Sequence, residues 1–237
     1  MNKEDRFPRI GKKLISIILP TKNRPVGLLR TLDSVVNTAS NLDDIEVLIR
    51  VDDNDDETWK VLRKIPEKLN RRVLVGPYLG GFGQVYRLFN ELAEVSCGDW
   101  ILLFNDDAWL TGPGWDKKIE ELQPLQVNPG WKGDEDICLL RVENDNPILN
   151  CFPALRRKMY EVVGHVSLSP HSDSYLQEIA AAVQCEVTVP GLLVTHDHGP
   201  FCYPDTHPIH FGQTVQMHKA GCVQRIQAYM KAKEKPQ

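Results

Sequence analysis

The sequence predicts an α/β fold with a mostly parallel central sheet flanked by helices, followed by a smaller and less regular C-terminal region. Residues 14–19, LISIIL, form a continuous apolar run, which is typical of a strand buried on both faces. Similar runs recur as far as residue 104, and a helical pattern separates each from the next. Because this alternation indicates parallel strands joined by right-handed crossovers, we expect ligands beyond the carboxyl ends of the strands.

The first helix follows the first strand closely. Leu28, Leu32 and Val35 recur at helical spacing after Pro25, a residue favoured in the first turn of a helix. The next expected elements, in order, are a strand at 45–51, a helix at 57–69, a strand at 72–75, a helix at 84–95 and a strand at 100–104. The loops that close the carboxyl ends of these strands are 20–24, 52–56, 76–83 and 105–107.

The alternation of strand and helix patterns ends beyond Leu110. Proline and glycine recur over residues 112–133, which is typical of turns and loops. The elements expected further on are short strands at 137–142 and 148–151, helices at 154–163 and 174–183, and a strand at 191–195 that leads into a histidine-rich loop. We interpret residues 1–237 as a single domain with a first half at 14–110, a second half at 111–212 and a C-terminal helix and tail at 213–237.

Composition narrows the class of protein. The chain has 237 residues, of which 42% are hydrophobic and 25% charged, values that are ordinary for a globular domain. A net charge of -4 without a basic stripe gives no support for a nucleic-acid partner. No run approaches the roughly 20 apolar residues that span a bilayer, so the expected compartment is the cytoplasm. The six cysteines form no CxxC pair and are expected to be reduced and structural.

Acidic residues follow two of the expected strands. Asp106 and Asp107 come directly after the strand at 100–104. Divalent cations such as Mg²⁺ prefer oxygen ligands and bridge carboxylates to phosphate oxygens, although a solvated turn would use the same residues. A second acidic run, residues 52–56, ends another strand at the same edge of the sheet. We assign Asp52 or Asp53 to ligand binding, and Asp55 or Asp56 to capping the helix that follows.

Three runs together resemble family 2 glycosyltransferases of GT-A fold in order and spacing. They are ISIILPTKNR at 15–24, the strand end VDD at 51–53, and GDWILLFNDD at 98–107. The resemblance covers residues 14–110 well and implies a Rossmann-like GT-A sheet whose first half binds a nucleotide sugar. It also implies metal-dependent transfer from a nucleotide diphosphate sugar, with a UDP-sugar favoured, to a hydroxyl of a glycan or small-molecule acceptor.

The same resemblance implies a set of donor-binding residues. Pro20, Thr21 and Arg24 would line the nucleoside pocket, and Asp52 or Asp53 would meet the base. Asp106 would lie near the ribose and the metal, and Asp107 would ligate the metal, which is Mn²⁺ or Mg²⁺. Two further candidates come from the third crossover. Gly83 belongs to a glycine-rich turn that could let backbone amides approach the donor, and Arg87 is a candidate because Phe89-Asn90 stands where relatives carry an Arg-Asn pair.

The second half offers a base and a further metal ligand. Asp173 begins a helix where family members keep an acidic pair whose last member is the catalytic base, and Ser172 replaces the first acid here. Considered alone, an aspartate at a helix start is more often a cap. His196 or His198 would complete the metal site. A separate zinc site built from the C-terminal histidines is the alternative.

The function predicted from these residues is inverting glycosyl transfer, with Asp173 taking the proton of the acceptor hydroxyl. Two alternatives stay open. One is a noncatalytic module of the same fold that binds a sugar nucleotide or a glycan. The other is a sugar-phosphate nucleotidyltransferase, which would need a glycine-rich phosphate loop after the first strand, where this chain has PTKNRP at 20–25.

Overall fold

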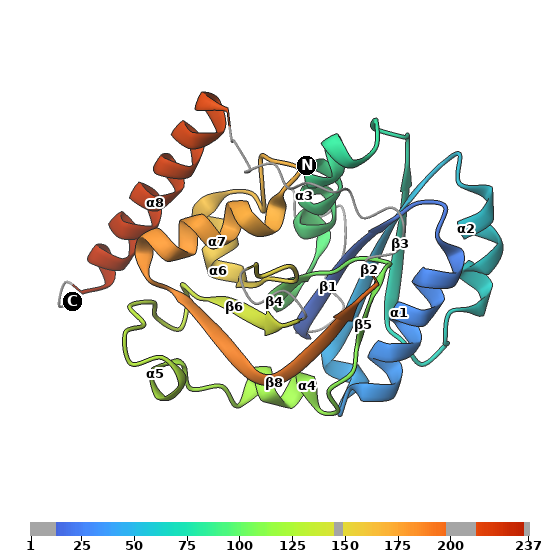
Figure 1. Ribbon diagram of the computed structural model, residues 1–237, viewed down its shortest axis with the longest axis horizontal. Coiled ribbons are helices and arrows are strands. Elements are labelled where there is room, and N and C mark those ends of the chain that lie inside the picture. Colours follow the sequence, from blue (N-terminus) through green and yellow to red (C-terminus); the bar gives the residue numbers. More distant parts are fainter. Residues whose placement is uncertain (1–12, 145–148, 198–211, 235–237) are drawn as a thin grey trace, which may run out of the picture.

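A curled central sheet organises the molecule (Figure 1). The computed structural model describes residues 13–144, 149–197 and 212–234. In this part of the chain eight strands form one sheet in the order β3-β2-β1-β4-β7-β6-β8-β5. The strands are β1 Lys13–Thr21, β2 Ile45–Asp52, β3 Arg71–Gly76, β4 Gly98–Leu103, β5 Ala108–Leu110, β6 Leu139–Glu143, β7 Ala154–Arg156 and β8 Glu186–His196. The pairs β1–β2, β1–β4, β2–β3 and β6–β8 are parallel, as predicted for a mostly parallel sheet.

Helices cover both faces of the sheet. They are α1 Pro25–Thr38, α2 Asp56–Val61, α3 Val85–Val95, α4 Trp115–Glu120, α5 Pro124–Val127, α6 Arg157–Val163, α7 Ser172–Val183 and α8 Gln213–Lys233. Alternate residues of β1 face opposite sides of the sheet. Ile17 packs in the core under α1 and α4, and Ile18 packs in the core under α3, α6, α7 and α8. Both side chains are fully buried, which explains the unbroken apolar run. None of the described helices has the length and apolar character needed to cross a membrane.

Three elements differ from the sequence prediction. The helix expected at 57–69 is shorter in the structure, where α2 is followed only by a short 3-10 turn, Leu62–Lys64. Pro66 accounts for this, because proline disfavours helical backbone at the residue before it. The strand expected at 148–151 is wrong for the described residues 149–151. The first turn of the helix expected at 154–163 is instead β7, which pairs with β4 and β6, so sheet pairing overrides the local helical pattern.

The last strand is longer than predicted. We expected it to begin at Gly191, but β8 runs from Glu186 to His196 and bends sharply along its length (Figure 1). Gly191 has a φ of +70°, a left-handed conformation that glycine adopts without a steric penalty. The bend lets one strand pair with both β6 and β5. It also brings His196 beside β5 and the loop that precedes it.

Asp55 ties together the loops that follow β1 and β2. Its side chain is fully buried and accepts a hydrogen bond from the Thr58 amide, at 3.0 Å, which caps α2 as predicted. The other carboxylate oxygen accepts from the amide of Asn23, at 2.7 Å. Asn23 has a φ of +54°, so this contact holds a left-handed residue in the loop between β1 and α1. The sequence indicated the cap but not this second role.

Removing this link should destabilise the fold. We expect Asp55→Ala to lower the free energy of unfolding by about 2–4 kcal/mol, because two backbone amides lose their acceptor. Urea denaturation monitored by circular dichroism measures the change. Asp56→Ala is the matched control, since Asp56 is the exposed neighbour in the first turn of α2. Equal stability of the two variants would show that the contacts of Asp55 contribute nothing measurable.

Candidate active site

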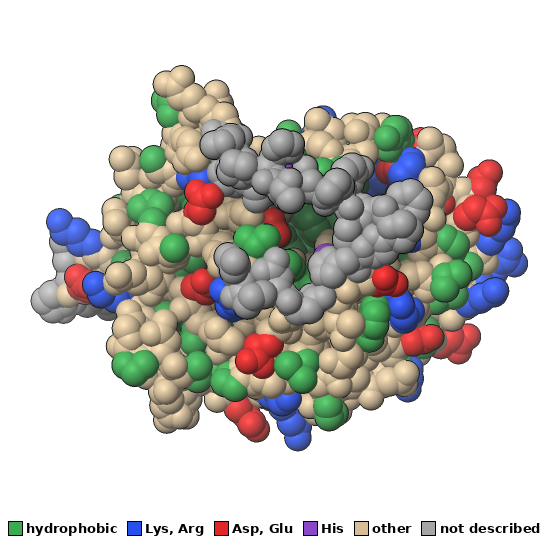
Figure 2. Space-filling view, viewed as in Figure 1, with side chains coloured by type: hydrophobic (Ala, Val, Ile, Leu, Met, Phe, Trp, Pro, Cys, Tyr) green, Lys and Arg blue, Asp and Glu red, His purple; other side chains and the backbone are tan. Residues whose placement is uncertain are grey.

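A cavity of about 970 Å³ opens at the carboxyl ends of the first strands. Figure 2 shows the hollow near the centre of one face, with hydrophobic side chains visible at its floor. Most of the residues singled out in the sequence line it, and they come from the loops after β1, β2 and β4, the start of α7 and the end of β8. These residues are Pro20, Thr21, Arg24, Asp52, Asp106, Asp107, Asp173 and His196.

Three of the predicted donor contacts lie elsewhere. Asp53, Gly83 and Arg87 are exposed and do not line the cavity, and His198 lies outside the described residues. Arg87 points to solvent because another face of α3 lines the cavity. That face carries Val85, Leu88 and Phe89.

The glycine-rich turn contributes through positions other than Gly83. A side chain at Gly83 would meet nothing within 4 Å. Gly80 and Gly81 have φ values of +104° and +78°, so these two positions are the ones that require glycine. Gly81 also lines the cavity.

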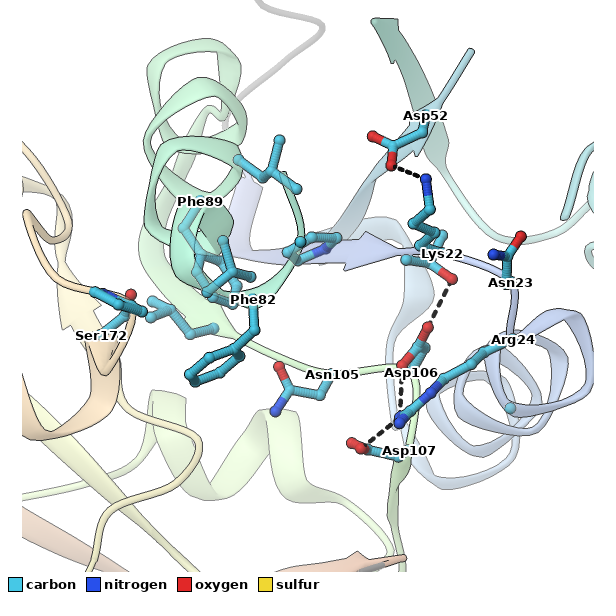
Figure 3. Close-up of a pocket in the computed structure, with 18 of the residues that line it drawn as sticks. Lys22, Asn23, Arg24, Asp52, Phe82, Phe89, Asn105, Asp106, Asp107 and Ser172 are labelled. Atoms are coloured by element: carbon cyan, nitrogen blue, oxygen red, sulfur yellow. Dashed lines mark hydrogen bonds and ion pairs between the residues drawn. The ribbon is translucent and has the colours of Figure 1, made fainter. Parts of the chain in front are cut away.

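Asp106 is the buried member of the carboxylate pair. Its Oδ2 accepts a hydrogen bond from the Thr21 hydroxyl at 2.8 Å, and its Oδ1 lies 3.3 Å from Nη1 of Arg24 (Figure 3). Burial raises the pKa of the Asp106 carboxyl to about 6, and the neighbouring charge of Asp107 acts in the same direction. Thr21 and Arg24 oppose the rise. The β1 loop therefore holds this carboxylate in a fixed orientation.

Asp107 is the more accessible member of the pair. Its Oδ2 lies 2.6 Å from Nη1 of Arg24, and its Oδ1 lies 3.1 Å from Nε2 of His196. Burial raises the pKa of the Asp107 carboxyl, but hydrogen bonds from His196 and Arg24 and the charges of both outweigh it, so the pKa lies below its usual value. β8 supplies His196 because β5 and β8 pair in the register Ala108 to His196. The carboxylate is ionised at neutral pH.

The residues around Asp107 fit a cation that is shared with a ligand. No group of three or more His, Cys, Asp or Glu side chains within residues 13–144, 149–197 and 212–234 is arranged to hold a metal ion by itself. A closed zinc site, which takes four protein ligands, is therefore not built from these residues. Mg²⁺ is usually held by one or two carboxylates together with substrate phosphates, and Asp107 with His196 offers such an incomplete set. The guanidinium of Arg24 bridges Asp106 and Asp107, which shows that the pair attracts a cation.

A second polar group surrounds Asp52. Nζ of Lys22 lies 2.9 Å from Oδ2 of Asp52 and 3.7 Å from the centre of the Tyr78 ring. Arg50, which is only 1% exposed, places Nη1 3.3 Å from Oδ1 of the same carboxylate. Sequence reasoning did not single out Lys22, although this residue lies in the loop at 20–24, where a ligand was expected. It also missed Arg50, since a buried arginine within an apolar strand leaves no sequence signal.

Asp173 faces the cavity from the first turn of α7. Its Oδ1 accepts a hydrogen bond from the amide of Ser174, its immediate neighbour, at 2.7 Å. Burial raises the pKa of the Asp173 carboxyl above its usual value, against the opposing effects of Ser174 and His171. The N-cap position of α7 is His171, so Asp173 does not act as the N-cap residue. The hydroxyl of Ser172, which stands in the place of the first acid, donates to the carbonyl of Ser169 at 3.2 Å.

Comparison with known proteins matches part of this chain to glycosyltransferases. Residues 16–124 match the family model described as glycosyl transferase family 2. The uncharacterized glycosyltransferase MG060 of Mycoplasma genitalium is 34% identical over 97 residues, which cover 39% of this chain and 32% of that protein. The chain thus spans about a third of the length of this relative. The resemblance to family 2 glycosyltransferases is confirmed over this segment.

Solved structures share the fold. The mannosyltransferase PcManGT from Pyrobaculum calidifontis, in complex with GDP-Man and Mn²⁺, has a TM-score of 0.61 at 14% identity, covering 96% of this chain and 66% of that one. S. aureus TarS 1-349 in complex with UDP-GlcNAc has a TM-score of 0.58 at 14% identity, covering 83% of this chain and 62% of that one. At this identity the likeness shows the fold alone, and the fold is the predicted GT-A fold.

Proposed function

We propose that this GT-A chain, whose residues 16–124 match glycosyl transferase family 2, transfers a sugar from a nucleotide diphosphate sugar to a hydroxyl acceptor. The observation that carries the proposal is that one cavity holds three chemically distinct groups. Asp52 with Lys22 suits a nucleobase, Asp107 with its neighbours suits a cation-bound diphosphate, and Asp173 suits a reacting hydroxyl. Each group supports one part of the transfer reaction.

The group around Asp52 favours a uracil base. The buried Arg50 engages Oδ1 of Asp52, while Oδ2 lies beside Lys22, and both Asp52 and Lys22 line the cavity. Uracil presents one ring N–H flanked by carbonyl oxygens, so the N–H can donate to Asp52 while Lys22 donates to a carbonyl. Guanine presents two adjacent N–H groups and would compete for both carboxylate oxygens. Tyr78 offers an aromatic face on which the base can stack, and Pro20 and Thr21 close the pocket.

The diphosphate would lie between Arg24 and Asp107. We assign Asp107 and His196, with Asp106 behind them, to holding Mn²⁺ or Mg²⁺ together with the donor phosphates. When bound, the cation would supply Lewis-acid stabilisation to the leaving diphosphate. In the present arrangement Arg24 is paired with both carboxylates. A cation at this position would take over that neutralising role. The Arg24 guanidinium would then be available to donate hydrogen bonds to phosphate oxygens.

Asp173 is proposed as the base that accepts the proton of the acceptor hydroxyl. Its raised pKa makes the ionised carboxylate a stronger base than an ordinary carboxylate. Figure 3 shows Ser172, its sequence neighbour, across the cavity from Asp107, with Phe82 and Asn105 between them. This placement supports attack from the face opposite the leaving diphosphate, and therefore inversion at the anomeric carbon.

A donor screen tests the proposal. Purified protein is mixed with UDP-, GDP- and TDP-sugars in the presence of Mn²⁺, with and without hydroxyl acceptors, and nucleotide diphosphate release is measured. We expect release from a UDP-sugar that requires an acceptor and stops on addition of a chelator. Tight UDP-sugar binding without release for any acceptor would instead support a noncatalytic module of the same fold.

Loss of His196 should weaken the cation site without disturbing the fold. We expect His196→Ala to lower the affinity for UDP about tenfold when Mn²⁺ is present and to leave it unchanged with chelator, since supporting groups of a metal site are typically worth 10- to 100-fold. Isothermal titration calorimetry gives both affinities. His218→Ala, an exposed histidine on α8 away from the cavity, is the control. Normal Mn²⁺-dependent affinity in the His196 variant would exclude this residue from the metal site.

A further inference from the structure

The cavity has a second, apolar end beyond the polar groups described so far. We infer that it receives an apolar group, an aryl ring, that the acceptor carries next to its reacting hydroxyl. This inference rests on the proposed glycosyl transfer. It adds a chemical class of acceptor, which the transfer chemistry alone does not define.

Helix α3 and the turn before it form most of this end. Val85, Leu88 and Phe89 follow one another at helical spacing and line the cavity. Phe89 and Leu103 are almost fully buried and form a fixed wall behind it. Phe82, in the 3-10 turn that precedes α3, is 49% exposed, and in Figure 3 its ring lies between Ser172 and Asn105. The side chains therefore form an apolar surface with one accessible aromatic ring.

Phe82 also connects this surface to the proposed base. Its ring contacts the ring of His171 edge to face, with 5.6 Å between the centres and 69° between the planes. His171 precedes Asp173 by two residues at the start of α7, and all three residues line the cavity. A group that packs on Phe82 is thereby held beside the Asp173 carboxylate. The acceptor, and not the nucleotide, is the reactant that must approach this base.

Two polar side chains at this end already have partners within the chain. The hydroxyl of Ser172 donates to the carbonyl of Ser169, and Oδ1 of Asp173 accepts from the amide of Ser174. The second oxygen of Asp173 is then the group that can meet the reacting hydroxyl. A sugar ring placed against Val85 and Leu88 would bury several hydroxyls without partners, which is unfavourable. An aryl ring carries no such groups, and its edge and face suit the pair formed by Phe82 and His171.

Matched acceptors test the inference. Phenyl and methyl β-glycosides of glucose, galactose and N-acetylglucosamine are compared as acceptors in steady-state assays with the donor that the screen identifies. We expect the phenyl compounds to have a KM at least about tenfold lower, because the ring is transferred from water to an apolar surface. Equal KM values for phenyl and methyl glycosides would overturn the inference and indicate that Phe82 contacts a sugar.

Variants separate the acceptor from the donor. Phe82→Ala should raise the KM of the phenyl glycosides about tenfold and leave that of the methyl glycosides and the affinity for UDP unchanged. Leu88→Ala should act in the same direction. Trp59→Ala is the control, because Trp59 is 39% exposed and lies outside the cavity. A loss of UDP affinity in the Phe82 variant, with unchanged acceptor KM, would assign the apolar end to the donor and contradict the inference.

A binding measurement keeps this test independent of turnover. The fluorescence anisotropy of 4-methylumbelliferyl β-glucoside is followed as protein is added without donor. Binding by the wild type and the Trp59 variant, together with loss in the Phe82 variant, supports an aryl site even if no donor is ever turned over. In that case only the proposed transfer reaction fails. Absence of binding to the wild type at millimolar protein, together with equal KM values, would overturn the aryl site itself.

Discussion

Replacing Asp107 by asparagine is expected to remove most of the metal dependence of nucleotide binding. In the wild type, UDP should bind far more tightly with Mn²⁺ than with chelator. Supporting partners of metal ligands are worth about 10- to 100-fold, so a direct ligand should contribute on the order of 100-fold. We therefore expect the affinity of Asp107→Asn for UDP in Mn²⁺ to fall about 100-fold, close to its value in chelator.

The geometry explains why this one substitution should act so strongly. Asp107 is the partly exposed carboxylate, and it touches both Arg24 and His196, while Asp106 lies behind it in a buried position. An amide at position 107 is nearly the same size and can still accept a hydrogen bond from Arg24, but it carries no charge for the cation. The substitution therefore changes the electrostatics of the site and little of its packing.

Calorimetry with and without Mn²⁺ measures this effect. Asp33→Asn is the control, because it removes the same charge from an exposed position on α1 that does not line the cavity. A melting curve on the same samples shows whether the variant is folded. Equal affinity of the wild type in Mn²⁺ and in chelator would remove the basis for a metal at Asp107. A variant that keeps the full difference would assign the cation to another ligand.

The part of the site that sequence predicted depends on local patterns. The run at 14–19 and the acidic residues after the strands at 45–51 and 100–104 place side chains at one edge of a parallel sheet. Since parallel strands end at the same edge, Asp52, Asp106 and Asp107 could be brought together without knowing any long-range contact. The structure places all three along one cavity.

The parts that were missed depend on contacts between distant segments. β7 is three residues long and exists because β4 and β6 lie on either side of it, which no local pattern records. Arg50 is buried in β2 and reaches Glu91 on α3, 41 residues away, as well as Asp52. Arg87 is different, because the apolar stripe of α3, with Phe89 and Leu92 buried, could have shown that Arg87 faces solvent.

The proposed base is the residue whose replacement should most affect turnover. Asp173→Asn is expected to slow sugar transfer in a single turnover by about 10²- to 10⁴-fold, the usual contribution of general-base catalysis. Donor affinity should stay near that of the wild type, because Asp173 lies at the end of the cavity that we propose receives the acceptor. A loss confined to the chemical step would identify an interaction made in the transition state and not in donor binding.

The pH dependence gives a second signature of Asp173. Burial raises the pKa of its carboxyl in the folded protein, and the base must be ionised to accept a proton. The wild-type transfer rate should therefore rise as pH increases through this raised pKa, whereas the residual rate of Asp173→Asn should lack that rise. Single-turnover rates across a pH series measure the difference. If the transfer rate of Asp173→Asn rises with pH as that of the wild type does, only lower at every pH, then another group is responsible for the rise.

The stability of Asp173→Asn distinguishes a catalytic base at position 173 from a residue that only supports the fold. A carboxyl whose pKa is higher in the folded than in the unfolded state binds its proton more tightly when folded, so ionisation weakens the fold as pH rises through the folded pKa. Asparagine at 173 is neutral at every pH and can still accept from the Ser174 amide. Asp173→Asn should then be at least as stable as the wild type at neutral pH, with Asp33→Asn as the charge control. If the folded variant binds UDP and transfers sugar at the wild-type rate, the base lies elsewhere. If the variant instead has a lower free energy of unfolding than the wild type, the carboxylate supports the start of α7.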